Sequence, residues 1–92
     1  MNREEIIAKV NAAILAEFDV EEEDLKPEAK LADDLGLDSL DSIDLVVAIE
    51  KGFKVNGVKI AEQQARTLRT LNDIYTYIEG YLAKQAPGAG AP

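Results

Sequence analysis

Residues 33–45 read Asp-Asp-Leu-Gly-Leu-Asp-Ser-Leu-Asp-Ser-Ile-Asp-Leu, a glycine-containing turn followed by an apolar run with helical spacing. The pattern places Ser39 at the expected start of a helix, among carboxylates. A serine there is commonly an N-cap, because its hydroxyl accepts a hydrogen bond from an unpaired amide of the first turn. Ser39 has no plausible base to activate it, since the chain contains no histidine. The stretch therefore predicts either a helix cap or a point of covalent attachment.

The flanking segments predict an all-α fold, a small four-helix bundle with three longer helices and one short helix. Apolar residues at spacings of three and four predict four helices. The predicted helices cover residues 3–17, about 39–52, 60–67 and from 70 or 71 onward. Residues 54–59 predict a loop, with a short hairpin at Asn56-Gly57 as the alternative. A long polar loop over residues 19–30 requires a crossover topology, and we expect Leu25 and Leu31 to anchor it.

The length of 92 residues predicts one domain. We expect that domain to span residues 1–85. Residues 86–92 hold only Ala, Pro and Gly, so we expect a disordered tail. The first five residues do not resemble a signal peptide, and no apolar run approaches the roughly 20 residues that span a bilayer. With no cysteine for disulfides or thiolate metal sites, we expect a cytoplasmic monomer without a metal and without membrane insertion.

The net charge of −8 is unevenly distributed. Residues 1–50 carry 15 acidic and 4 basic side chains, whereas residues 51–92 carry 3 acidic and 6 basic side chains. Nucleic acid is excluded as a partner, because its binding depends on Lys and Arg that neutralise phosphates. The acidic half favours protein partners with basic patches.

Catalysis by this chain is not expected. Most nucleophilic and zinc chemistry needs His or Cys, which are absent. A calcium loop of EF-hand type fails, because setting Gly36 as its sixth position makes Leu31 the first and Ser42 the twelfth. A two-carboxylate glycosidase needs a sugar-sized cleft, which a bundle of this size is not expected to supply.

Residues 31–53 resemble, almost position by position, the attachment motif of acyl carrier proteins. The motif fixes Gly36, Asp38, Ser39 and Leu40 together with the apolar face of the following helix. The resemblance implies that Ser39 carries 4′-phosphopantetheine through a phosphodiester bond and that the thiol of this group holds acyl groups as thioesters. A helix N-terminus suits such a phosphodiester, because free amides and the helix dipole favour an anion there.

The resemblance also implies the partners and the surface that binds them. A phosphopantetheinyl transferase, with Mg²⁺ and coenzyme A, is expected to modify Ser39. Acyl-transferring and acyl-modifying enzymes with basic patches are the expected later partners, and the acyl chain cargo can be held among the helices. The expected recognition residues are acidic at Asp38, Asp41, Asp44 and Glu50 and apolar at Leu40, Ile43 and Val47. Ile43 and Val47 are equally well explained as core residues.

Two features depart from the family pattern. Lys51, Gly52 and Lys54 stand where further acidic residues are common, and the segment around Asn56-Gly57 is longer than expected. The pathway therefore stays open among fatty acid, polyketide and related lipid biosynthesis. An aminoacyl or peptidyl carrier protein is the alternative within the same superfamily. The alternative from another class is an unmodified acidic protein-interaction module in which Ser39 is only a cap.

Overall fold

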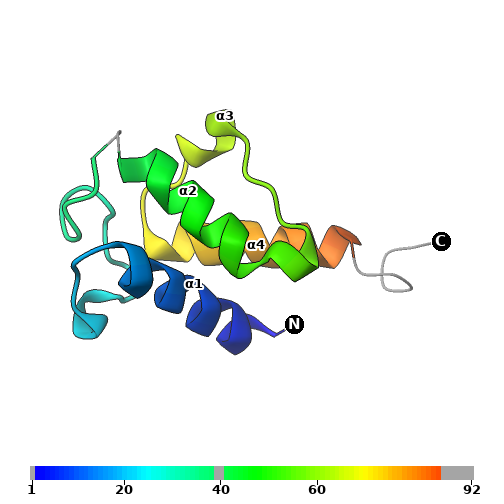
Figure 1. Cartoon of the computed structure of the whole chain (residues 1–92), viewed down its shortest axis with the longest axis horizontal. Helices are drawn as coiled ribbons and strands as arrows, with labels where there is room; N and C mark the ends of the chain where they lie inside the picture. The colour runs from blue at the N-terminus through cyan, green and yellow to red at the C-terminus, as the bar shows by residue number, and fades with distance from the viewer. Residues whose placement is uncertain (1, 39–40, 86–92) are drawn as a thin grey trace.

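The computed structural model describes residues 2–38 and 41–85, which fold into helices around a single core (Figure 1). The elements are α1 (Arg3–Glu17), the short 3-10 helix η1 (Glu22–Asp24), α2 (Asp41–Gly52), the 3-10 helix η2 (Lys54–Asn56), α3 (Glu62–Ala65) and α4 (Leu71–Gln85). Within the described residues no strand forms, apart from an isolated bridge between Lys30 and Thr70. The predicted all-α bundle of three longer helices and one short helix is confirmed. The expected tail over residues 86–92 lies outside the described residues.

α1 begins where its sequence offers a capping box. The Asn2 side chain accepts a hydrogen bond from the Glu5 amide at 2.9 Å, and the Glu5 carboxylate accepts one from the Asn2 amide at 3.4 Å. These bonds satisfy two amides that the first turn leaves without a helical partner. The buried stripe of α1 consists of Ile6, Val10 and Ile14.

α4 packs against α1 through one apolar face and a polar contact at its edge. The face is fully buried and consists of Leu71, Ile74, Tyr75 and Ile78. The Tyr75 hydroxyl donates to the Asn11 side chain on α1, and the Arg3 guanidinium donates to Asn72 Oδ1 at 2.6 Å. Burial raises the pKa of Tyr75 above its ordinary 10.0, opposed by the hydrogen bond to Asn11 and the Arg3 charge. Hydrogen-bonded polar groups, one of them the charged Arg3 guanidinium, therefore join the two helices beside the core.

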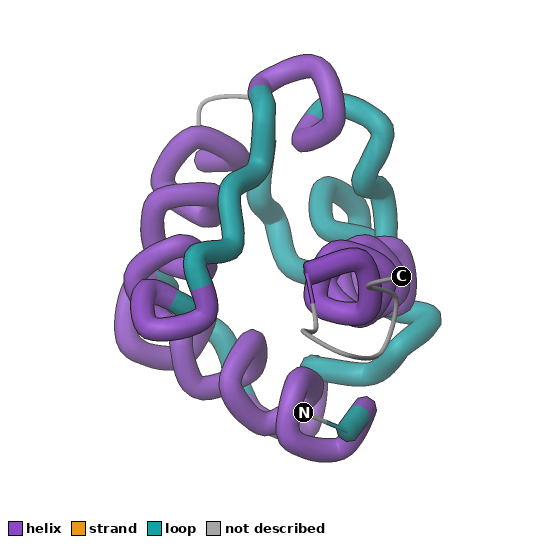
Figure 2. The backbone as a smooth tube through the Cα atoms, turned by 90° about the vertical axis from the view of Figure 1, so that its right-hand side faces the viewer, coloured by secondary structure: helices purple, strands orange, loops and turns teal. Residues whose placement is uncertain are grey.

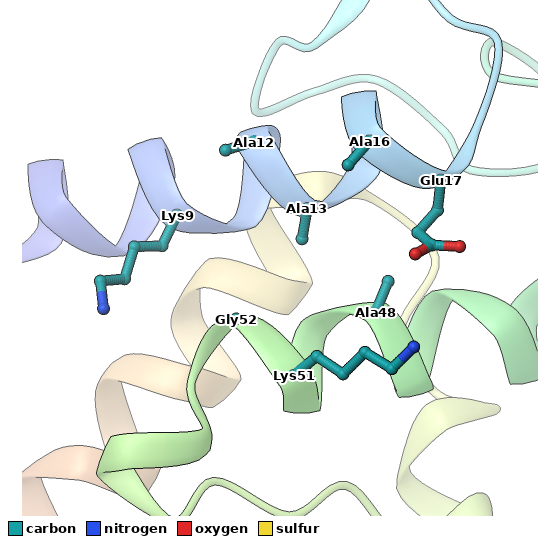
Figure 3. Close-up of a pocket in the computed structure, with 8 residues that line it drawn as sticks. All are labelled: Lys9, Ala12, Ala13, Ala16, Glu17, Ala48, Lys51 and Gly52. Atoms are coloured by element: carbon teal, nitrogen blue, oxygen red, sulfur yellow. The ribbon is translucent and has the colours of Figure 1, made fainter.

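α1 and α2 approach each other through small side chains. Ala13 and Ala48 project into the space between the two helices (Figure 3). A Cβ at Gly52 would lie 3.8 Å from the Ala13 Cβ, an ordinary contact distance. The hollow left between the helices has a volume of about 400 Å³ and is lined by Lys9, Ala12, Ala13, Ala16, Glu17, Ala48, Lys51 and Gly52.

The two connections complete the bundle. Leu25 and Leu31 of the first connection are buried, as predicted. The second connection follows η2, turns at Gly57 with a φ of +71° and then runs back toward α3 (Figure 2). No hairpin forms there; of the predicted loop over residues 54–59, the first half is the 3-10 helix η2 and the rest is a turn and irregular chain. The return places α3 beside the first half of α2 (Figure 1).

Candidate functional site

A compact turn leads into α2. The Lys30 amide donates to the Asp34 carboxylate at 2.7 Å, and the Leu37 amide donates to the Leu31 carbonyl at 2.8 Å. Both leucines are buried. Gly36 has a φ of +70°, a conformation that L side chains rarely adopt, so glycine is required for the chain to turn here. The turn fixes the position at which the backbone reaches the start of α2.

The start of α2 is capped by a reciprocal pair of aspartates. The Asp41 amide donates to Asp38 Oδ1 at 3.1 Å, and the Asp38 amide donates to Asp41 Oδ2 at 3.2 Å. The Asp38 carbonyl accepts a further hydrogen bond from the Ser42 amide at 3.1 Å. This is the pattern of a capping box, with a carboxylate in both positions. The predicted attachment residue Ser39 and its neighbour Leu40 stand between the two aspartates in the sequence and lie outside the described residues.

The other predicted recognition residues lie on α2 or at its start. Asp38 and Asp44 are exposed, and Asp41 is half-buried. Ile43 and Val47 expose 60% and 44% of their surface, one helical turn apart. They are therefore not core residues, and the core-only interpretation of these two positions is wrong.

A groove lies between α2 and the segment around α3. Its volume is about 450 Å³, and its lining is mainly apolar on the α2 side and mixed apolar and charged on the opposite side. The lining residues are Ser42, Ile43, Val46 and Val47 from α2, with Ile60, Glu62, Ala65 and Arg66 from the opposite side. The four residues of the opposite side were not among the predicted site residues. Because they lie in a weakly patterned segment, only the folded arrangement shows that they face α2.

Glu50, a predicted recognition carboxylate on α2, has a hydrogen-bond partner in the segment opposite α2. It is half-buried, and its Oε2 accepts a hydrogen bond from the Ile60 amide at 2.8 Å. Lys51 and Lys54, one and four residues further along, are exposed. The charge of the surface therefore changes from acidic at the start of α2 to basic at its end.

The groove fits a long, thin amphipathic group attached at the start of α2. Ser42 and Ile43, which line the α2 side of this groove, stand three and four residues after Ser39 in the sequence. The apolar residues of the lining suit an alkyl chain, and the Arg66 guanidinium, which binds Glu62 through one nitrogen, has further hydrogen-bond donors for amide or carbonyl groups. The residues present are compatible with a pantetheine arm that bears an acyl group.

The described residues contain no group of three or more His, Cys, Asp or Glu side chains placed to hold a metal ion. Over the same part of the chain, none of the helices has the length and apolar character needed to span a bilayer.

Comparison with known proteins assigns the family. The family model described as a phosphopantetheine attachment site matches residues 8–78. The acyl carrier protein of Thermosynechococcus vestitus is 40% identical over 83 residues, which cover 90% of this chain and 99% of that protein. The acyl carrier protein of Thermotoga maritima is 45% identical over 78 residues, covering 85% of this chain and 93% of the relative. The prosthetic group implied by this match is 4′-phosphopantetheine, and the chain belongs to the acyl carrier protein family.

Proposed function

We propose that Ser39 is the residue to which 4′-phosphopantetheine is attached and that the chain carries acyl groups for fatty acid, polyketide or related lipid biosynthesis. When bound, the prosthetic group supplies a thiol that holds acyl groups as thioesters. The chain itself is then a substrate for other enzymes and does not catalyse their reactions. Its own residues display the serine, steer the partner and shelter the cargo.

The observation that carries this proposal is the capping pair at the start of α2. Because Asp38 supplies a capping carboxylate to the Asp41 amide, the helix start does not depend on a serine for its cap. Ser39 stands between these two residues and within the span matched by the attachment-site family. These facts favour attachment over the alternative in which Ser39 is only a cap.

In the proposed attachment step, Ser39 Oγ displaces 3′,5′-ADP from coenzyme A with the help of a Mg²⁺-dependent transferase. A bond forms between Oγ and the phosphorus, the bond from that phosphorus to the ADP oxygen breaks, and the hydroxyl proton passes to a base of the transferase or to water. No histidine of this chain can accept that proton, because the chain has none.

The remaining predicted residues form the proposed docking surface. Asp38 and Asp44 are exposed carboxylates that raise the rate of encounter with a basic partner surface. Ile43 and Val47 are exposed apolar side chains that gain burial when a partner or cargo covers them. Leu40 is proposed for the same role from its place in the sequence.

The test is intact-protein mass spectrometry after incubation with coenzyme A, Mg²⁺ and a broad-specificity phosphopantetheinyl transferase. The chain contains two serines, Ser39 and Ser42, which provide a matched pair of variants. We expect the wild type and Ser42→Ala to gain one phosphopantetheine and Ser39→Ala to gain none.

A gain in Ser39→Ala would contradict the assignment of the residue. No gain in any variant with several transferases would favour the unmodified interaction module. If the chain is modified, loading with acyl groups and with aminoacyl groups by the respective enzymes then separates the acyl carrier from the aminoacyl or peptidyl carrier.

A further inference from the structure

The second wall of the groove consists of α3 residues, of Arg66 at the end of α3 and of Ile60, and Ile60 lies in a segment whose backbone is contacted by side chains of α2 and α4. Residues 58–60 connect the left-handed turn at Gly57 to the residue before α3 and form no regular secondary structure. Ile60 is 6% exposed and lines the groove. Because residues 58–60 lack the internal hydrogen bonds of a helix, their position depends on what their amides and carbonyls contact.

Three side chains from two helices make these contacts. From α2, the Glu50 carboxylate accepts from the Ile60 amide at 2.8 Å. From α4, the Tyr77 hydroxyl lies 2.9 Å from the Lys59 carbonyl and also contacts the Gln64 side chain. The Tyr81 hydroxyl, also on α4, donates to the Gly57 carbonyl at 3.1 Å. The segment of residues 57–60 is therefore held between α2 and α4 by hydrogen bonds from side chains of both helices to its backbone.

Glu50 and Tyr77 act on neighbouring points of this wall. Their partners, Ile60 and Lys59, are adjacent residues. Burial raises the pKa of Tyr77, and electrostatic interactions with Tyr81 and with Glu50 raise it further. The carboxylate is thus close enough to the hydroxyl for its field to be felt, as expected if both hold the same short segment.

We propose that Glu50 is a positioning residue of the groove, which places Ile60 as the wall opposite Val46 and Val47 by accepting its amide hydrogen. Its function in this role is that of a hydrogen-bond acceptor, whereas recognition by a basic partner would use its charge. This proposal adds to the proposed carrier function. It rests on that function only in assuming that the groove holds the acyl group carried on the phosphopantetheine arm.

The two roles of Glu50 are separated by a pair of substitutions. Glu50→Gln removes the charge and keeps an oxygen that can accept from the Ile60 amide, whereas Glu50→Ala removes both. Asp44→Asn is the matched control, because Asp44 is an exposed carboxylate on the same helix and its substitution removes charge from the proposed docking surface. All three variants leave the proposed attachment residue unchanged.

The first measurement is amide hydrogen exchange of Ile60 by NMR on the unmodified chain. In Glu50→Gln and Asp44→Asn, we expect the Ile60 amide hydrogen to exchange at the wild-type rate. In Glu50→Ala, we expect it to exchange on the order of tenfold faster, because the hydrogen bond to a charged acceptor is removed. The amide of Val10, a fully buried residue in the middle of α1, reports global unfolding. Unchanged exchange at Ile60 in Glu50→Ala overturns the proposal, as does an equal rise at Val10 or a rise of the same size in Glu50→Gln.

The second measurement is the steady-state kcat/KM of the transferase for the same variants. A positioning role predicts that Glu50→Gln keeps the wild-type value while Asp44→Asn lowers it. A loss in Glu50→Gln equal to that in Asp44→Asn would assign Glu50 to charge recognition and overturn the proposal.

The third measurement concerns the cargo. With an octanoyl group on the arm, the wild type and Glu50→Gln are expected to gain thermal stability over the unacylated form, and Glu50→Ala is expected to gain less. Equal gains in all three overturn the role in cargo binding. Because exchange at Ile60 is measured on the unmodified chain, its outcome is independent of whether Ser39 is the attachment residue.

Discussion

Replacing Asp38 with alanine tests whether the cap of α2 resides in this aspartate. The substitution removes the Oδ1 acceptor of the Asp41 amide, while the bond from the Asp38 amide to the Asp41 carboxylate can persist because it uses the backbone of residue 38. The loss is therefore that of one N-cap side chain, about 1 kcal/mol of unfolding free energy. In a domain of this size such a loss lowers the melting temperature by about 4–8 °C.

The assay is urea unfolding followed by far-ultraviolet circular dichroism, with thermal melts in parallel. Asp38→Asn keeps an acceptor and is expected to lose only a few tenths of a kcal/mol, about the charge contribution at a helix N-terminus. Ser39→Ala is expected to change the free energy of unfolding by less than about 0.5 kcal/mol. A neutral Asp38→Ala together with a loss of about 1 kcal/mol in Ser39→Ala would refute the reasoning, because the serine would then be the cap.

Two further predictions concern the faces of α2 and its charge. Ile49→Ala removes a side chain that is 1% exposed and should lower the free energy of unfolding in urea by about 2–5 kcal/mol. Ile43→Ala should lower it by about 0.5 kcal/mol or less and should instead lower the kcat/KM of the transferase. A larger loss of stability in Ile43→Ala than in Ile49→Ala would contradict this division of the helix. Lys51→Glu should raise the kcat/KM of a transferase with a basic docking face at low salt, and this gain should disappear at high salt. Lys26→Glu makes the same change of charge on another segment and should raise the kcat/KM less.

The bounds of the helices follow closely from the sequence, because their signals are local. α1 covers the predicted residues 3–17, and α4 begins at Leu71 as expected. Gly52 is the last residue of α2, in agreement with the weak helix propensity of glycine. Spacing, capping residues and glycine each act within a turn or two of chain, so a pattern in the sequence is enough to detect them.

The orientation of the helices about their axes was predicted less well. In the sequence, the apolar stripe with spacings of three and four consists of Ile7, Val10, Ile14 and Phe18, with Ile6 and Leu15 beside it. The structure instead buries Ile6 completely and leaves Ile7 half-buried. Both residues continue an apolar spacing, and the choice between them depends on where α2 and α4 lie. The buried leucines at positions 35 and 37 were likewise not identified as core, because a turn has no periodicity that separates inside from outside.

The groove could not be predicted from one sequence, because its two walls are distant in the chain and its far wall is formed by the short helix α3 and the irregular segment before it. Glu50 and Ile60 are ten residues apart, and their contact depends on the return of the chain after Gly57. The resemblance to acyl carrier proteins assigned Glu50 to the docking surface, as one of its acidic positions. A carboxylate near the end of a helix offers no local sign of whether it faces a partner protein or a backbone amide of its own chain.

α2 has apolar side chains on two opposite sides, and this arrangement supports a carrier more directly than any single contact. Its core face is formed by Leu45, Ala48 and Ile49. At 3.6 residues per turn, Ile43 and Val47 lie about 180° around the helix from that face, and both are exposed. A helix that served folding alone would place polar residues there. Because these two side chains contribute little to the core, their apolar character is best explained by what they cover when the arm, its cargo or a partner enzyme is bound.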